Sequence, residues 1–240
     1  MSEKEFGLQL YSVRDTTPED MAGTLKKVAE LGYTSVEPAG FFDHTAEEFN
    51  AMLAETGLKL SGTHSQWTEL RDNYEETVAF HKAIGNKRYI IPGADLSSKE
   101  KIDEFVDFIN EYQPKLAAEG IDLQYHNHAH EFCPNEDGSY IHEELQKRTK
   151  LNFEIDTYWV YRSGNDPIKL LKKLKDRVNC IHVKDGTMAD GRSCGLGTAP
   201  VAKVVAYAAK HGIDMVVESE GLKPDGISEV TRCINYLKTL

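Results

Sequence analysis

Four apolar runs of the chain end directly on side chains that can bind a metal ion or move a proton. These end residues are His126, Asp156, His182 and Glu218. Two imidazoles and two carboxylates suit a divalent metal ion such as Mn, Co, Fe or Zn, and they leave coordination positions open for substrate oxygens. A single side chain of this kind is more often a structural group or a helix cap than a ligand. Four together, at the ends of four successive runs, favour one metal-centred site.

The first of these runs continues into a cluster of histidines, His126, His128 and His130, followed by Glu131. Alternation would place all three imidazoles on one face if the strand continued. The acidic stretch that leads to Gly138 indicates instead that the strand ends early. We therefore expect His126 to face inward and the other two histidines to support the site or lie on the surface. Glu131 remains open between a substrate contact and a loop residue.

Further candidate residues end other apolar runs or follow the four ligands closely. Lys184 lies two residues after His182 and shares its face, where it could stabilise an enolate or hold a substrate oxygen; a surface lysine is the alternative. Trp159 and Trp67 could stack on a sugar ring or simply cover the core. Such candidates include Tyr11, Glu37, His64, Trp67, Trp159 and Lys184.

The elements that must position these residues alternate regularly. Strand-like runs cover residues 6–11, 34–37, 58–64, 88–91, 121–126, 151–155, 179–183 and 213–218. Helical spacing covers residues 18–31, 45–56, 69–84, 97–119, 141–147, 166–175, 200–211 and 226–237, with a kink or break expected at Pro114. Eight strand–helix units predict a single (β/α)8 TIM barrel as one domain over residues 1–240. A doubly wound open sheet is the alternative, but no G-x-G-x-x-G follows the first strand.

Composition limits the classes of partner. The chain has 28 Lys and Arg against 39 Asp and Glu, a formal net charge of −11, which argues against nucleic acid and anionic membranes as partners. The four cysteines lack C-x-x-C spacing, which argues against a disulfide or zinc-knuckle framework. The glycine-rich stretch 191–197 lacks P-loop spacing. Residues 1–5 show no apolar signal region and no run is long enough to span a membrane, so we expect a cytoplasmic protein; an export signal removed earlier would leave no trace.

Several of these motifs together resemble the xylose isomerase-like TIM-barrel family of sugar and sugar-phosphate isomerases and epimerases, which also includes inosose dehydratases and endonuclease IV-type enzymes. The resemblance covers essentially the whole chain. The motifs that carry it are Gly7–Ser12, Gly32–Glu37, Tyr125–His128 with Glu131-Phe132, Ile155–Trp159, Ile181–Asp185 and Val217-Glu218.

The resemblance implies a divalent metal ion and a proton-transfer mechanism. Similar ketose epimerases hold the metal with Glu, Asp, His and Glu and use the two glutamates to remove and return a proton. The last three ligands fall on Asp156, His182 and Glu218, but the first falls on His126. A second departure is Trp159, where those epimerases carry a histidine. The Tyr-His-Asn-His motif resembles a branch associated with keto-sugars and oxidised glycosides. The resemblance also makes a homodimer reasonable.

The resulting hypothesis is a metal-dependent sugar isomerase or epimerase that works through an enediolate. Glu218 would take the α-proton, and His126 or Glu37 would return it. Lys184 and His64 would stabilise the developing oxyanion. The remaining predicted substrate contacts are Glu131, Trp159, Trp67 and Tyr11.

Three alternatives remain open. One is a hydratase or lyase that acts by β-elimination on a 3-keto-glycoside or inosose-like substrate. Another is a non-catalytic sugar-binding protein. The third is a phosphodiesterase of the endonuclease IV kind, against which the charge and the single set of ligands argue.

Overall fold

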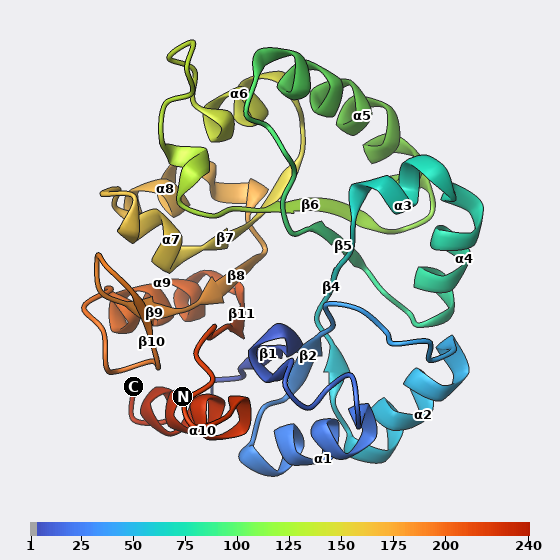
Figure 1. The fold of residues 1–240 in the computed structure, drawn as a ribbon, viewed down its shortest axis with the longest axis vertical. Coiled ribbons are helices and arrows are strands. Elements are labelled where there is room, and N and C mark those ends of the chain that lie inside the picture. Colours follow the sequence, from blue (N-terminus) through green and yellow to red (C-terminus); the bar gives the residue numbers. More distant parts are fainter. Residues whose placement is uncertain (1–3) are drawn as a thin grey trace.

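The computed structural model describes residues 4–240 and contains a barrel of parallel strands surrounded by helices (Figure 1). Hydrogen-bonded neighbours follow the order β3, β2, β1, β11, β8, β7, β6, β5, β4. The predicted TIM barrel is confirmed. Residues 1–3 of the stretch considered for a targeting signal lie outside the described part, and the single domain over residues 1–240 stays a prediction. The strands are β1 (Gly7–Gln9), β2 (Ser35–Glu37), β3 (Lys59–Leu60), β4 (Thr63–His64), β5 (Arg88–Ile91), β6 (Asp122–His126), β7 (Asn152–Asp156), β8 (Cys180–Val183) and β11 (Asp214–Val217).

The third predicted strand, residues 58–64, is divided into β3 and β4, and this division closes the barrel. β3 pairs with β2, whereas β4 pairs with β5. Ser61 and Gly62 lie between the two halves. A Cβ atom on Gly62 would come within 2.8 Å of Ile90 Cδ1 and 3.3 Å of the Glu37 carboxylate. Glycine is therefore suited to the point where the strand exchanges one neighbour for the other.

Two helix predictions need correction. The helix predicted over residues 69–84 is two helices, because Asn73 ends one with its N–H and begins the next with its C=O. The helix through Pro114 is not broken, since buried side chains on both sides, including Ile109 and Leu116, hold it on the barrel. The outer helices are α1 (Met21–Leu31), α2 (Ala46–Thr56), α3 (Trp67–Asp72), α4 (Tyr74–Ala83), α5 (Lys99–Ala118), α6 (Ile141–Arg148), α8 (Pro167–Leu174), α9 (Val201–His211) and α10 (Gly226–Leu237).

Several short elements add to this pattern at the loops. The first strand ends at Gln9 and passes into a 3-10 turn, η1 (Leu10–Val13). Helix α7 (Thr157–Arg162) follows β7 directly, and β9 (Asp185–Gly186) forms an antiparallel hairpin with β10 (Gly191–Arg192). Elements this short contain too few residues for a periodic signal. Among the helices described, none is both long and apolar enough to cross a membrane.

The strands near the site carry an apolar outer face and a polar inner face. In β6 and β7 the outward side chains join the apolar core between strands and helices. The inward positions are polar, and near the amino end Asp122 accepts hydrogen bonds from Gln124, Asn152 and Asn179. Nearer the carboxyl ends, His126 Nδ1 lies 3.2 Å from Glu154 Oε2. The inward residues of these two strands are Asp122, Gln124, His126, Asn152, Glu154 and Asp156.

Candidate active site at the carboxyl ends of the strands

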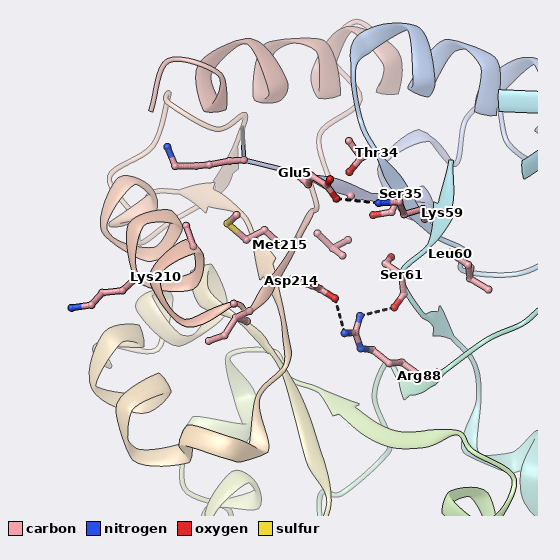
Figure 2. A pocket seen from close by; sticks show the side chains of 16 residues that line it. Glu5, Thr34, Ser35, Lys59, Leu60, Ser61, Arg88, Lys210, Asp214 and Met215 are labelled. Carbon is pink, nitrogen blue, oxygen red and sulfur yellow. Dashed lines mark hydrogen bonds and ion pairs between the residues drawn. The ribbon is translucent and has the colours of Figure 1, made fainter. Parts of the chain in front are cut away.

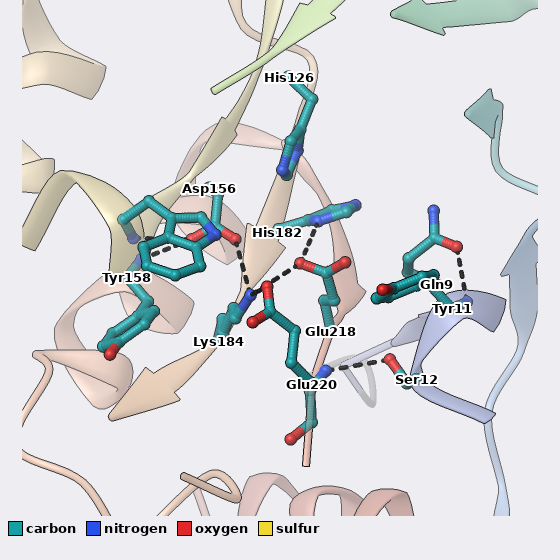
Figure 3. A network of polar contacts seen from close by, with 12 residues as sticks. Gln9, Tyr11, Ser12, His126, Asp156, Tyr158, His182, Lys184, Glu218 and Glu220 are labelled. Carbon is teal, nitrogen blue, oxygen red and sulfur yellow. Dashed lines mark hydrogen bonds and ion pairs between the residues drawn. The ribbon is translucent and has the colours of Figure 1, made fainter. Parts of the chain in front are cut away.

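The four predicted metal ligands lie together at the carboxyl ends of neighbouring strands. His126 ends β6, Asp156 ends β7, His182 lies in β8 and Glu218 follows β11. One potential ligand atom from each lies within 4.8 Å of the others, and all four side chains are buried. Figure 3 shows Asp156, His182 and Glu218 gathered close to the Lys184 ammonium group.

The two carboxylate oxygens of Asp156 have different surroundings. Oδ1 accepts hydrogen bonds of 2.9 Å from the N–H groups of Tyr158 and Trp159 and thereby caps α7. Oδ2 is buried and accepts no hydrogen bond from residues 4–240, although Lys184 Nζ lies 3.9 Å away. Burial raises the pKa of Asp156 to about 7, against the opposing effect of Lys184. Asp156 can therefore cap a helix and bind a metal ion with different oxygens.

Lys184 is a buried cation of this cluster and not a surface lysine. Its Nζ lies 3.1 Å from Glu218 Oε2, 2.5 Å from Glu220 Oε1 and 4.5 Å from the Trp159 ring centroid. Burial lowers the pKa of Lys184, but the surrounding carboxylates outweigh burial and raise it overall. For Glu218 burial has the opposite effect and raises the pKa. Lys184 and His182 outweigh burial and hold the pKa of Glu218 well below its usual range.

Beneath the four predicted ligands, Glu154 contacts three imidazole rings. Its Oε2 lies 2.8 Å from His64 Nε2, 3.2 Å from His126 Nδ1 and 3.1 Å from His182 Nε2. Burial raises the pKa of Glu154, but the three imidazoles outweigh it and hold the pKa well below the usual range. Glu154 is not among the site residues predicted from the sequence. A signal for it exists, because alternation along β7 places it on the same inward face as Asp156.

Glu37 lies in the barrel below the pocket, where it has no access to a substrate bound there. Its Oε1 accepts a hydrogen bond of 2.7 Å from Gln9 and lies 2.8 Å from His182 Nε2 and 3.2 Å from His64 Nε2. The side chain is fully buried and does not line the pocket above the site. Burial, together with Glu154, raises the pKa of Glu37. In this position Glu37 supports two imidazoles from below.

A pocket of about 620 Å³ opens above this cluster. Five residues predicted from the sequence line it: Tyr11, His64, His126, Trp159 and Glu218. Arg14 also lines the pocket, but it was not predicted, because it follows η1 without any recognisable motif. The Arg14 guanidinium lies 4.3 Å from the Tyr11 ring centroid and donates a hydrogen bond of 2.9 Å to the Glu220 carbonyl. It joins the loops after β1 and β11 at the rim.

Two predicted substrate contacts do not line this pocket. Trp67 begins α3 and packs edge-on against aromatic rings of α5. Glu131 is fully buried and accepts hydrogen bonds from the Tyr125 hydroxyl at 2.9 Å and the His128 N–H at 2.8 Å. Glu131 thereby fixes the loop after β6, so that His128 lines the pocket while His130 is largely exposed.

The glycine-rich stretch 191–197 is arranged around the carboxylate of Asp185. This carboxylate accepts hydrogen bonds of 2.7–3.2 Å from the backbone N–H groups of Gly186, Gly195, Gly197 and Ala199. A Cβ atom on Gly197 would lie only 2.2 Å from Asp185 Oδ1, so the approach requires glycine. Converging N–H groups of this kind bind anions in other proteins, but here the protein's own carboxylate occupies them.

A second hollow, of about 660 Å³, lies at the amino ends of the strands (Figure 2). Four of its charged groups form two ion pairs. Lys59 lies 3.4 Å from Glu5, and Arg88 lies 2.6 Å from Asp214 while donating a hydrogen bond to the Ser61 carbonyl. Because TIM barrels carry their active sites at the carboxyl ends, we place the candidate site in the pocket above His126.

The donor atoms of the upper cluster fit a divalent metal ion. Within residues 4–240, neither Asp156 Oδ2 nor His182 Nδ1 has an adequate hydrogen bond, although Glu218 Oε2 lies 3.4 Å from that nitrogen. Unpaired carboxylate and imidazole donors in a buried site suit Mn, Fe, Co or Zn. A second, deeper set consists of His64, His126, Glu154 and His182. Glu154 already contacts all three imidazoles of that set at hydrogen-bonding distance, so the upper set is the better candidate.

Comparison with known proteins identifies the family. Residues 25–236 match the family described as xylose isomerase-like TIM barrel. This segment extends from α1 to α10, so the chain belongs to that family.

Two solved structures of sugar phosphate isomerase/epimerases from Parabacteroides distasonis ATCC 8503 are similar. One has a TM-score of 0.85 and 26% sequence identity, covering 99% of this chain and 98% of that one. The other has a TM-score of 0.86 and 23% identity over 99% and 94% of the two chains, which supports the fold alone. The inosose dehydratase of Geobacillus thermodenitrificans (strain NG80-2) is 25% identical over 173 residues, 67% of this chain. The match spans 54% of that curated relative, about half its length.

Proposed function

We propose that this protein is a metal-dependent enzyme that removes a proton next to a carbonyl group of a sugar-like substrate, as sugar isomerases and epimerases do. The observation that supports this most is the convergence of His126, Asp156, His182 and Glu218 beneath the pocket at the carboxyl ends. The similarity to a structure described as a sugar phosphate isomerase/epimerase points the same way.

Glu218 is the candidate base, and Lys184 supports it. When bound, a divalent metal ion supplies Lewis-acid chemistry that makes a proton next to a carbonyl more acidic. Glu218 lines the pocket, and its contact with Lys184 favours the ionised carboxylate that can accept this proton. The Lys184 ammonium group can stabilise negative charge that develops on a substrate oxygen. Trp159 lies over Lys184 and lines the pocket, where its ring is placed to contact a sugar.

The group that returns the proton differs from the one in the ketose epimerases that the sequence resembles. His126 stands where those enzymes have a glutamate, and Glu37 lies beneath the pocket. His64 lines the pocket from β4, outside the upper ligand set and several strands away from Glu218. We therefore assign the return of the proton to His64, with His126 as a ligand.

The presence of a histidine in place of the second glutamate supports a second candidate reaction. This is β-elimination of a hydroxyl group from a keto-sugar or inosose-like substrate. Glu218 would take the α-proton, and an imidazole would protonate the hydroxyl group that leaves as water. Only one carboxylate base is needed. The similarity to an inosose dehydratase favours this candidate, and loss of water from the product would distinguish it from epimerisation.

Solvent-deuterium exchange at the α-carbon of keto-sugars tests the proposal. With Mn²⁺-loaded protein we expect exchange that Glu218→Gln slows at least about 100-fold, the usual contribution of a general base. Exchange at the wild-type rate in Glu218→Gln would contradict the assignment of the base. Sugar binding without any exchange in the wild type would favour a non-catalytic sugar-binding protein.

A further inference from the structure

The proposed reaction gives Glu154 no role, although this residue contacts three imidazoles in the barrel. A single oxygen, Oε2, is the common neighbour of His64 Nε2, His126 Nδ1 and His182 Nε2. Even a protonated carboxyl group could donate only one hydrogen to these three nitrogens. The ring nitrogens must therefore supply most of the hydrogens, with Glu154 as the acceptor.

The position of the hydrogen on one ring nitrogen determines what the other can do. A neutral imidazole carries one N–H and one lone pair. For His126, Glu154 is the carboxylate within hydrogen-bonding distance of Nδ1, at 3.2 Å. A hydrogen on Nδ1 leaves the lone pair on Nε2, at the opposite edge of the ring.

In His182 the other ring nitrogen, Nε2, is the one that faces Glu154. Its Nε2 lies 3.1 Å from Glu154 Oε2 and 2.8 Å from Glu37 Oε1, so two carboxylates favour the hydrogen on this nitrogen. In the neutral ring that can bind a metal ion, the lone pair is then on Nδ1, the buried atom that has no adequate hydrogen bond within residues 4–240. This is also the ring nitrogen near Glu218, at 3.4 Å.

We propose that Glu154 is a positioning residue that sets the tautomers of both histidine ligands, so that His126 presents Nε2 and His182 presents Nδ1 to the metal ion. This inference rests on the proposed function and deepens it. It also decides between the two donor sets, because a metal ion in the deeper set would need the opposite nitrogen of each ring. Carboxylates that orient metal-bound histidines typically change metal affinity by about 10- to 100-fold.

The first test is ¹⁵N NMR of histidine-labelled protein, with and without one equivalent of Zn²⁺. In the zinc-free protein we expect the hydrogen of His126 on Nδ1. With zinc we expect metal-bound Nε2 in His126 and metal-bound Nδ1 in His182, each with a hydrogen on the other nitrogen. The reverse pattern would overturn the proposal and place the metal ion in the deeper set.

Glu154→Gln provides the second test, with Glu37→Gln as the matched control. The amide can donate as well as accept, so we expect mixed tautomers of His126 and a 10- to 100-fold weaker zinc affinity by competition with a chelator. Glu37 contacts His182 and His64, so Glu37→Gln should leave the His126 signals unchanged. Unchanged tautomers and affinity in Glu154→Gln would leave Glu154 a merely structural role and overturn the proposal.

These measurements separate the inference from the proposed function. If wild-type protein binds no zinc or other divalent metal ion, the proposed function fails, while the His126 tautomer of the zinc-free protein still decides the role of Glu154. If Glu154→Gln does not fold, the two wild-type spectra remain decisive.

Discussion

Asp156 has two roles, because one side chain both caps a helix and belongs to the candidate metal site. One oxygen caps α7 through the N–H groups of Tyr158 and Trp159, and the other lies buried near Lys184 without a hydrogen bond from the described residues. The two roles can therefore be separated by substitution.

We predict that Asp156→Asn loses bound metal but keeps most of its stability, because the amide oxygen can still cap α7. Asp156→Ala should lose the metal and also about 1 kcal/mol of unfolding free energy, the usual contribution of an N-cap. Elemental analysis measures the metal, and urea unfolding with chelator measures the stability. One equivalent of metal retained by Asp156→Asn would contradict its role as a ligand.

The sequence was sufficient to predict that the four candidate ligands lie together, but not the layer beneath them. Each ligand ends an apolar run, and the barrel brings the carboxyl ends of such runs together. Spacing along one strand fixes the face of Glu154 but not its neighbours across the lumen, because these depend on strand register and barrel closure. For the same reason Glu37, paired in register with Gln9, was expected in the pocket but lies below it.

At the level of elements, the carboxylate of Asp185 holds the segment between β8 and α9 in place. Four backbone N–H groups converge on it, from Gly186, Gly195, Gly197 and Ala199. The residues on which this loop depends were visible in the sequence as glycines, but the carboxylate at its centre was not, because no local spacing identifies it.

We predict that Asp185→Asn lowers the unfolding free energy by about 2–4 kcal/mol, because its amide nitrogen cannot accept hydrogen bonds and leaves N–H groups without a partner. Asp190→Asn is the control, since Asp190 lies in the same loop but is exposed and pairs with Thr187 and Arg192. It should change stability by no more than about 0.5 kcal/mol. Equal effects of the two substitutions in urea unfolding would contradict the role of Asp185.

At the scale of the whole molecule, two histidines that do not line the candidate site connect stability to pH. Burial lowers the pKa of His81 to about 4 and that of His142 to about 3. His142 is stacked between Phe132 and Phe153, and His81 accepts a hydrogen bond from Asn86. Both rings are therefore neutral in the folded protein, whereas an unfolded chain protonates them near pH 6.5.

We predict that His81 and His142 lower the unfolding free energy as the pH drops from about 6.5 towards 4, an effect that the raised pKa of Asp156 opposes. In this range each of these histidines binds a proton in the unfolded state but not in the folded state. Each therefore lowers the unfolding free energy by up to about 1.4 kcal/mol per pH unit. His142→Phe removes one of these protons and should make the dependence shallower. Urea unfolding at several pH values measures it, and an unchanged slope in His142→Phe would show that this ring does not titrate as expected.

The backbone N–H groups that donate hydrogen bonds to the Asp185 carboxylate have a consequence for substrate selection. TIM barrels often hold a substrate phosphate with N–H groups of the loops after the seventh and eighth strands. Here the loop after β8 has already used such groups on Asp185, and Glu218 and Glu220 add negative charge at the pocket. A phosphorylated sugar would need an ionic anchor elsewhere on the rim, where Arg14 is available. An uncharged sugar needs no such anchor and would be distinguished by the stereochemistry of its hydroxyl groups.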